Sequence, residues 1–223
     1  MTEQFLPNLE RGLPGLLTGL NQTLNMILIS GTITFIVGIT FGVTLVITQK
    51  GGLLENFLVF NFLDKGINVI RSIPFLILMI LLIPVSRMLV GTGIGVRGAI
   101  VPLSVGAIPF FSRQIETAIA EVDKGLIEAS LAMGFSPLAI IFKVYLRESI
   151  PSITRVTMIT AINLISFTTM AGAIGAGGLG DFAIRYGHQL GFTDMLWLTI
   201  AVILALVSII QLTGNTIIKL TKR

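Results

Sequence analysis

The stretch from Leu24 to Ile47, LNMILISGTITFIVGITFGVTLVI, contains no aspartate, glutamate, lysine or arginine. It lies inside a longer uncharged segment bounded by Arg11 and Lys50. A helix needs about 20 mostly apolar residues to cross the hydrocarbon core of a bilayer. The stretch is long enough for this, so it predicts a transmembrane helix and sets the class of fold.

The composition of the whole chain supports a membrane protein. Of its 223 residues, 53% are hydrophobic and only 12% are charged, whereas about 25% of the residues of a soluble domain are charged. This balance excludes a soluble enzyme, a disordered chain and a nucleic-acid binder that relies on bulk charge. The chain has no cysteine, which excludes disulfides, thiolate metal sites and cysteine nucleophiles.

Four more segments are candidates for crossing the membrane. Residues 156–180 and 195–218 are long and apolar, whereas 72–86 and 98–112 are 15 residues each and are bounded by arginines. Terminal arginines can snorkel to the interface and extend a short span, and the first short segment can also borrow apolar residues 57–63. We therefore predict an all-α integral membrane protein with five transmembrane helices.

An odd number of crossings places the two termini on opposite sides, and the loop cations predict which side is which. With the N-terminus outside, the inner side holds nine Lys and Arg residues and the outer side four. The inner ones are Lys50, Arg113, Lys124, Lys143, Arg147, Arg155, Lys219, Lys222 and Arg223, and the outer ones are Arg11, Arg87, Arg97 and Arg185. This predicts an N-out/C-in chain. We expect an extracellular or interfacial segment over 1–19, a transmembrane domain over 20–215 and a basic cytoplasmic tail over 216–223.

The loop between the third and fourth predicted spans, about 113–155, is the long one, and it carries helix signals. Asp123 can cap a helix that runs from 124 to 133, and Gly134 follows where a left-handed residue ends many helices. Ser136 can cap a second helix with Pro137 in its first turn. We predict a cytoplasmic helix-turn-helix.

The second of these helices is predicted to be amphipathic and to lie at the membrane surface. Its apolar residues recur at helical spacing and form one stripe: Leu138, Ile141, Phe142 and Tyr145. The loop is either an ordinary interfacial connector or a docking element for a cytoplasmic partner. A loop that only connects two spans needs no pair of capped helices, which favours docking.

This loop resembles the "EAA" loop of bacterial ABC-importer permeases. The matching residues are Glu128, Ala129, Ser130, Gly134 and Leu146. Ser130 replaces the third residue of the family pattern, Val144 replaces an isoleucine and Arg147 stands where the family usually has proline. The resemblance implies that these residues couple the permease to an ATPase, with Glu128, Ala129 and Gly134 in a groove on its surface.

A more specific resemblance, to permeases of methionine importers, covers residues 20–215. It rests on Arg71-Ser72-Ile73-Pro74-Phe75, on the segment from Ile83-Pro84 to Gly95, on residues 99–107 and on Met170 with the glycine-rich segment 175–180. It implies a permease subunit that moves methionine, L and also D, across the bacterial cytoplasmic membrane by alternating access. The implied partners are a cytoplasmic ATP-binding-cassette dimer, an extracytoplasmic methionine-binding protein, a second copy of the chain and membrane lipid, with no nucleic acid.

Such a permease needs no catalytic residue, metal or cofactor of its own, because the ATPase subunits hydrolyse ATP. The single histidine, His188, cannot form a catalytic cluster within one chain. A permease for another amino acid is the nearest alternative. A gradient-driven secondary transporter is less favoured, because it should carry acidic residues within its spans.

Three residues are candidates for the translocation path or its gate. Met170 is either core packing or a flexible apolar plug. Arg71 is either a snorkelling residue or lies at the inner mouth of the path. Pro74 is either tolerated or bends a helix that shapes the path. In the first span, Gly38 and Gly42 lie four residues apart and predict a close helix contact.

Overall fold

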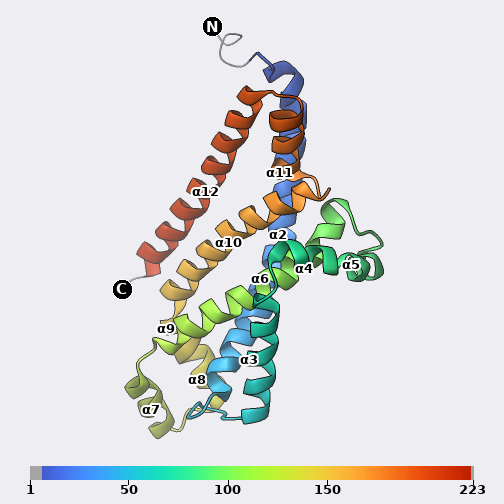
Figure 1. Ribbon diagram of the computed structural model, residues 1–223. Helices are drawn as coiled ribbons and strands as arrows, with labels where there is room; N and C mark the ends of the chain where they lie inside the picture. The colour runs from blue at the N-terminus through green and yellow to red at the C-terminus, as the bar shows by residue number, and fades with distance from the viewer. Residues whose placement is uncertain (1–6, 222–223) are drawn as a thin grey trace. The chain divides into compact units, whose positions relative to one another are not determined.

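The structure is a computed structural model that describes residues 7–221, and the described part of the chain is helical throughout (Figure 1). Residues 1–6 of the predicted N-terminal segment, and Lys222 and Arg223 of the predicted basic tail, lie outside the described residues. Residues 9–19 form the first turns of a long helix, and residues 216–221 form the end of another.

Within residues 7–221, four helices are long and apolar enough to cross a membrane. They are α2 (Leu9–Thr48), α6 (Gly95–Ala120), α10 (Ile150–Ala173) and α12 (Thr193–Thr221). They match four of the five predicted spans and extend beyond most of them. The helix α6 continues through Pro102 and Pro109 without a break.

The second predicted span, 72–86, is not a single helix. Its region contains α3 (Phe57–Arg71), α4 (Phe75–Leu81) and α5 (Ile83–Val90), none longer than 15 residues. The physical cause is proline. Pro74 is the N-cap of α4 and has an extended ψ of 134°, its ring disfavours helix at the preceding residue, Ile73, and Pro84 stands in the first turn of α5.

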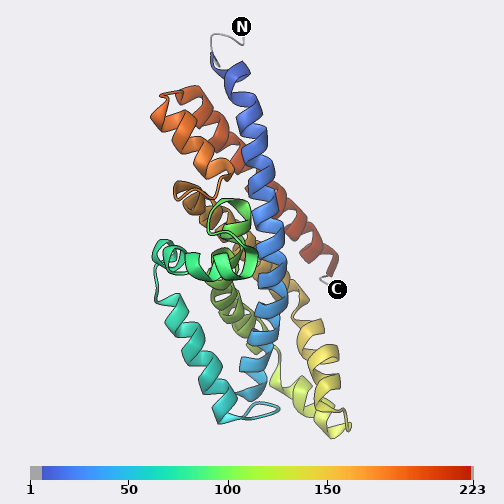
Figure 2. The same cartoon turned by 90° about the vertical axis from the view of Figure 1, so that its right-hand side faces the viewer.

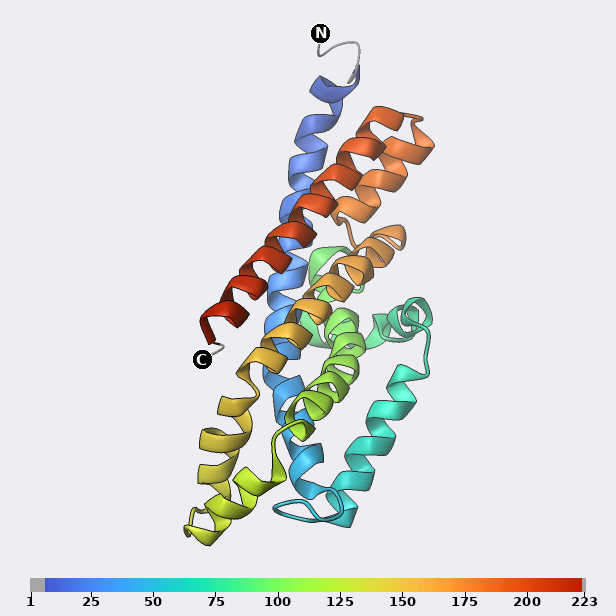
Figure 3. The ribbon, with the colours of Figure 1, turned by 90° about the vertical axis from the view of Figure 1, so that its left-hand side faces the viewer.

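Two further segments between the long helices consist of short helices. The segment after α6 contains α7 (Lys124–Ala132), α8 (Pro137–Ile140), the π-helical segment η1 (Ile141–Tyr145) and α9 (Leu146–Glu148). Figure 3 shows α7 and α8 joined by a sharp turn. The segment after α10 contains α11 (Gly178–Phe182) and the π-helical segment η2 (Ala183–Gln189).

The contacts of the chain form two compact units, and long helices contribute to both. The first unit contains residues 1–33, 73–106 and 161–210, and the second contains 34–72, 107–160 and 211–223. In the first unit, α11 lies beside the first turns of α2 (Figure 2). One apolar cluster there joins Leu16, Leu179, Phe182 and Met195, and another joins Met26, Met79, Ala99, Leu103, Ala171 and Ala176.

The core of the second unit is built on the close contact between α2 and α6. A Cβ atom added to Gly38 would lie 2.5 Å from Phe111, and one added to Gly42 would lie 2.5 Å from Ile115. These two glycines therefore form the helix-packing face that their spacing predicts. Apolar side chains from η1 complete this core.

Candidate functional site

The helix α7 begins with the predicted cap. The Asp123 carboxylate accepts hydrogen bonds from the backbone N–H groups of Gly125, at 2.6 Å, and Leu126, at 3.3 Å. Two N–H groups that have no partner within the helix are satisfied in this way. The second helix of the loop is also capped as predicted, since the Ser136 hydroxyl accepts from the Ala139 N–H at 3.3 Å.

The turn after α7 depends on Gly134. Its φ is +82°, a left-handed conformation that glycine adopts without steric cost. The Gly134 N–H donates to the Leu131 carbonyl at 2.9 Å, and the Phe135 N–H donates to the Ser130 carbonyl at 3.1 Å. This pair of bonds is a Schellman motif, and it confirms the predicted helix end. The glycine thus determines the direction in which the chain leaves α7.

The three residues that resemble the EAA motif do not face the same way. Glu128 and Ala129 are exposed on α7, whereas Ser130 is buried and its hydroxyl donates to the Leu126 carbonyl at 2.7 Å. The structure therefore places the first two on the exposed side of α7 and the third on its buried side.

The segment that follows α8 anchors the loop in the core of the second unit. Ile140, Ile141, Val144 and Tyr145 are buried in the core cluster with residues of α2, α6 and α10, and Leu146 packs against that cluster half-buried. The four residues of the predicted apolar stripe do not share one environment. Ile141 and Tyr145 are buried, whereas Leu138 and Phe142 are exposed by 65% and 66%.

The segment from Leu138 to Tyr145 has a buried side and an exposed side. The inward face of this segment is formed by residues 140, 141, 144 and 145, so positions 138 and 142 lie on the other side. The exposed pair joins other large exposed hydrophobic residues of the loop. We call this set the α7–α8 apolar surface: Leu126, Leu131, Met133, Phe135, Leu138 and Phe142. An apolar surface of this kind marks an interaction site when it is contiguous and faces water.

Burial also changes the chemistry of one anchoring residue. Removal from water raises the pKa of the Tyr145 phenol above its ordinary value, because burial disfavours the charged phenolate. Tyr145 thus stays neutral at physiological pH and acts as an apolar anchor with a polar tip.

A polar cluster in the second unit was not predicted from the sequence. The Arg113 guanidinium pairs with Asp64 and, at 2.7 Å, with Glu116, and it donates to the Asn68 side-chain oxygen at 3.1 Å. Asn68 in turn donates to the second Asp64 oxygen at 3.2 Å. The cluster joins α3 to α6.

The three candidate path residues are exposed. Met170 lies on α10 with 38% of its surface exposed, Pro74 caps α4, and Arg71 is the last residue of α3. Pro74 and Met170 belong to the first unit and Arg71 to the second. Within the first unit, Phe75 stacks on Phe167 at 4.1 Å, which brings the start of α4 against the segment of α10 that carries Met170.

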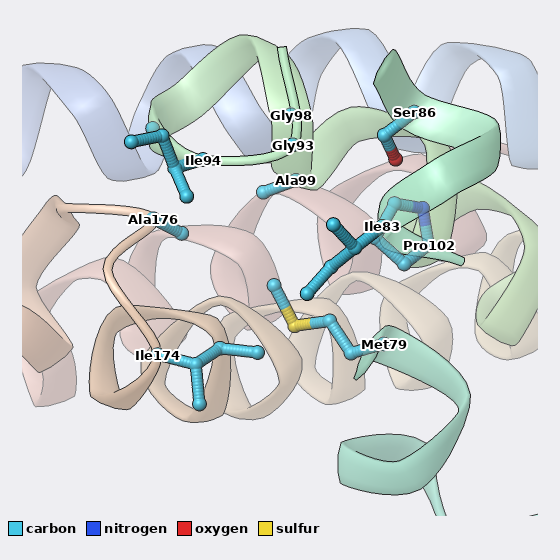
Figure 4. A pocket seen from close by; sticks show the side chains of 11 residues that line it. Met79, Ile83, Ser86, Gly93, Ile94, Gly98, Ala99, Pro102, Ile174 and Ala176 are labelled. Carbon is cyan, nitrogen blue, oxygen red and sulfur yellow. The ribbon is translucent and has the colours of Figure 1, made fainter. Parts of the chain in front are cut away.

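The first unit contains a small apolar cavity. It has a volume of about 10 Å³ and is lined by α4, α5, the start of α6 and residues 174–176, with the Met79 and Ile83 side chains at its centre (Figure 4). The buried Ser86 hydroxyl lines it and has no hydrogen-bond partner among residues 7–221. A space of this size holds about one water molecule, so it is not a site for an amino acid.

Comparison with known proteins defines the class to which this arrangement belongs. Residues 35–214 match the family described as binding-protein-dependent transport system inner membrane component. The chain is 48% identical over 205 residues to the probable D-methionine transport system permease protein MetI of Vibrio cholerae, covering 92% of this chain and 91% of that protein. It is 37% identical to the corresponding Haemophilus influenzae protein, covering 91% and 95%.

The fold gives the same result. A chain from a native crystal form of the MetNI methionine ABC transporter, solved in inward-facing conformations, superposes with a TM-score of 0.91 at 40% identity, covering 95% of this chain and 98% of that chain. The protein therefore belongs to the family of binding-protein-dependent transport system inner membrane components. Within this family it is a MetI-type permease, a multi-pass inner-membrane subunit of an ABC transporter that is not itself catalytic.

Proposed function

We propose that the chain forms the path of an ATP-driven importer and moves methionine across the membrane by alternating access. The observation that carries the proposal is the capped α7, its Schellman turn at Gly134 and the α7–α8 apolar surface, all attached to the second unit through η1. The substrate is supported by the similarity to MetI of V. cholerae and to the MetNI methionine ABC transporter.

The loop is suited to carry motion between an ATPase subunit and the membrane helices. Exposed Glu128 and Ala129 on α7 are available to enter a groove on the ATPase, and the α7–α8 apolar surface supplies the area that closes around them. Buried Ser130 and half-buried Leu146 support α7 and η1 from the inside. A displacement of α7 is therefore transmitted to α2, α6 and α10 through packed side chains instead of being absorbed by a flexible loop.

The chain is proposed to cross the membrane five times. The segment from α3 to α5 is apolar enough to form a fifth, broken crossing, in addition to the four long helices. Five crossings and the excess of Lys and Arg in one set of loops favour an N-out/C-in chain. The α7–α8 apolar surface then faces the cytoplasm, where an ATPase can reach it, and residues 174–192 face outward.

The path itself is proposed to be gated by Met170. Its thioether is flexible and partly exposed, and an apolar side chain can close a narrow path by excluding water. Pro74 sets the break before α4, whose Phe75 stacks against α10, and we propose that Arg71 lies at the inner mouth. Substitution of a residue that belongs to the path or its gate should change the leak of substrate across the membrane or the amount of uptake per ATP hydrolysed.

A single chain supplies one α7, whereas two ATPase subunits need two docking elements. We therefore propose a homodimer with two-fold symmetry and a path along its axis. An extracytoplasmic binding protein would deliver methionine to the outer side. Membrane lipid would surround the exposed apolar faces of the long helices.

The test is uptake of radiolabelled L-methionine into proteoliposomes that contain the permease, its ATPase and its binding protein. Uptake that requires ATP is expected, with D-methionine tested as a competitor. Glu128→Arg should abolish co-purification of the ATPase. Glu148→Arg, at another exposed glutamate of the same loop, should not. Uptake driven by an ion gradient without the ATPase would contradict the proposal, and uptake of a different amino acid only would contradict its substrate.

A further inference from the structure

A larger cavity than the one in Figure 4 lies elsewhere in the first unit, between the first turns of α2 and the helix formed by α11 and η2. Its volume is about 280 Å³, close to the lower end of the range for small-molecule sites. We call it the α2–α11 cavity. It is lined by Pro14, Gly15, Thr18, Gly19, Gln22, Gly178, Asp181, Phe182, Arg185 and Tyr186.

Specific contacts hold the two walls of this cavity in place. The Gln22 side-chain oxygen accepts from the Gly178 N–H at 2.7 Å, and the Thr23 hydroxyl accepts from the Leu179 N–H at 2.9 Å. A Cβ atom added to Gly19 would lie 3.2 Å from the Gly178 carbonyl oxygen. The start of α11 is thus fixed against α2 without closing the space beside it.

Opposite charges lie together on one wall. Asp181 and Arg185 are four residues apart on the same helical face and form an ion pair. The Asp181 carboxylate is mostly buried, with 17% of its side chain exposed, whereas the Arg185 guanidinium reaches outward with 62% exposed. A small molecule entering the cavity therefore meets both a cation and an anion.

Two aromatic residues also line the cavity. Tyr186 stacks on Phe182 at 4.5 Å, and a Cβ atom added to Gly15 would lie 3.2 Å from the Tyr186 hydroxyl. The Phe182 ring is only 3% exposed, so the aromatic surface that the cavity offers is the half-buried ring of Tyr186. Aromatic rings are favourable surfaces for a thioether or an aliphatic chain.

The geometry points to the α2–α11 cavity as a binding site for a zwitterionic α-amino acid. The α-carboxylate accepts hydrogen bonds from the Arg185 guanidinium, the α-ammonium donates to the Asp181 carboxylate, and the side chain lies against the Tyr186 ring. This inference rests on the proposed function and deepens it. In an N-out chain the cavity is on the outer side, where it would receive the amino acid before it enters the path.

A zwitterionic lipid headgroup offers the same chemistry, because phosphatidylethanolamine also carries one anion and one ammonium group. The free amino acid is favoured because the aromatic wall adds a place for a side chain, which a headgroup lacks. The two sources are separated by the lipid in which the protein is tested.

The experiment measures binding of radiolabelled L-methionine to the permease–ATPase complex in nanodiscs of phosphatidylcholine and phosphatidylglycerol, without the binding protein. Saturable binding is expected, competed by L-methionine and at least tenfold more weakly by N-acetyl-L-methionine and L-methioninamide, each of which lacks one charge. Arg185→Gln should weaken binding at least tenfold, whereas Arg185→Lys should retain most of it. Asp181→Asn should remove the discrimination against N-acetyl-L-methionine.

Arg97→Gln is the matched control. It removes an exposed arginine of the same unit that does not line the cavity, and it should leave binding unchanged. Unaltered binding in both Arg185→Gln and Asp181→Asn would overturn the inference, and so would an equal loss in Arg97→Gln. Absence of methionine binding, together with phosphatidylethanolamine that co-purifies only when Arg185 is present, would overturn it in favour of a lipid.

The same preparations separate this inference from the proposed function. ATP-driven methionine uptake by the wild type, with normal binding by the cavity variants, would refute the cavity and leave the importer intact. If the importer takes up a different amino acid and not methionine, the substrate assignment fails. The cavity is then tested with that amino acid and its N-acetyl and amide derivatives.

Discussion

Replacement of Gly134 by valine should uncouple the transporter while leaving the membrane helices folded. The glycine has a φ of +82°, and a Cβ atom added there meets no other atom within 4 Å. The cost of the substitution is therefore conformational and not a clash. A residue with a Cβ atom loses about 1–2 kcal/mol in the left-handed region, and a β-branched residue fits there worst.

The chain can avoid this strain only by giving up the turn. That route breaks the two capping hydrogen bonds, from Gly134 to Leu131 and from Phe135 to Ser130, each worth about 0.5–1.5 kcal/mol. Either route costs about 1–3 kcal/mol. Since 1.4 kcal/mol changes an equilibrium tenfold, the population with α7 correctly directed should fall by roughly 5- to 150-fold.

The assay measures ATP hydrolysis and methionine uptake together in proteoliposomes that contain the ATPase and the binding protein. In Gly134→Val, uptake per ATP hydrolysed should fall strongly, while insertion and dimer recovery remain at wild-type level. Gly134→Asn should retain most coupling, because asparagine tolerates the left-handed region.

Gly51 provides the matched control. It is also left-handed, with φ of +75° and no atom within 4 Å of an added Cβ atom, but it lies in the turn between α2 and α3. Gly51→Val carries the same backbone strain away from α7 and should preserve coupling. Wild-type coupling in Gly134→Val, or an equal loss in Gly51→Val, would refute the reasoning.

Three further results are expected. Gly42→Ala would place its Cβ atom 2.5 Å from Ile115, and this overpacking should destabilise the protein by about 1–3 kcal/mol. The measurement is the unfolding temperature in detergent, which should fall, and an unchanged temperature would contradict the close contact. Met170→Ala should raise substrate leak or ATP hydrolysis without uptake, and normal values of both would remove Met170 from the gate. The raised pKa of Tyr145 leaves stability unaffected below about pH 10, where the unfolded phenol begins to ionise, and stability is then lost as the pH rises through the folded-state pKa. Ultraviolet titration should show a late phenolate signal that disappears in Tyr145→Phe.

The features that were predicted well depend on neighbours within four residues. The caps at Asp123 and Ser136 and the end of α7 at Gly134 are local hydrogen-bond patterns, and the sequence signals each one directly. The contact face of Gly38 and Gly42 was also predictable, because two small residues one turn apart allow close approach whichever helix packs against them. Its partner, α6, was not.

The features that were missed join residues far apart in the chain. Asp64 and Arg113 are 49 residues apart, and Gln22 and Gly178 are 156 apart. Each residue by itself resembles an ordinary polar group near a helix end. The division of the predicted apolar stripe into buried and exposed residues was missed for a related reason, since the position of the core decides which side of a short amphipathic segment is buried.

The sequence by itself determined the class of fold, the four long apolar helices and the turn chemistry of the loop after α6, because hydrophobic length and local capping are properties of short segments. The tertiary structure alone decided that Leu138 and Phe142 are exposed, and that Asp181 and Arg185 line the α2–α11 cavity. These outcomes depend on packing between distant segments, and the free energy of that packing is not encoded in any one of them.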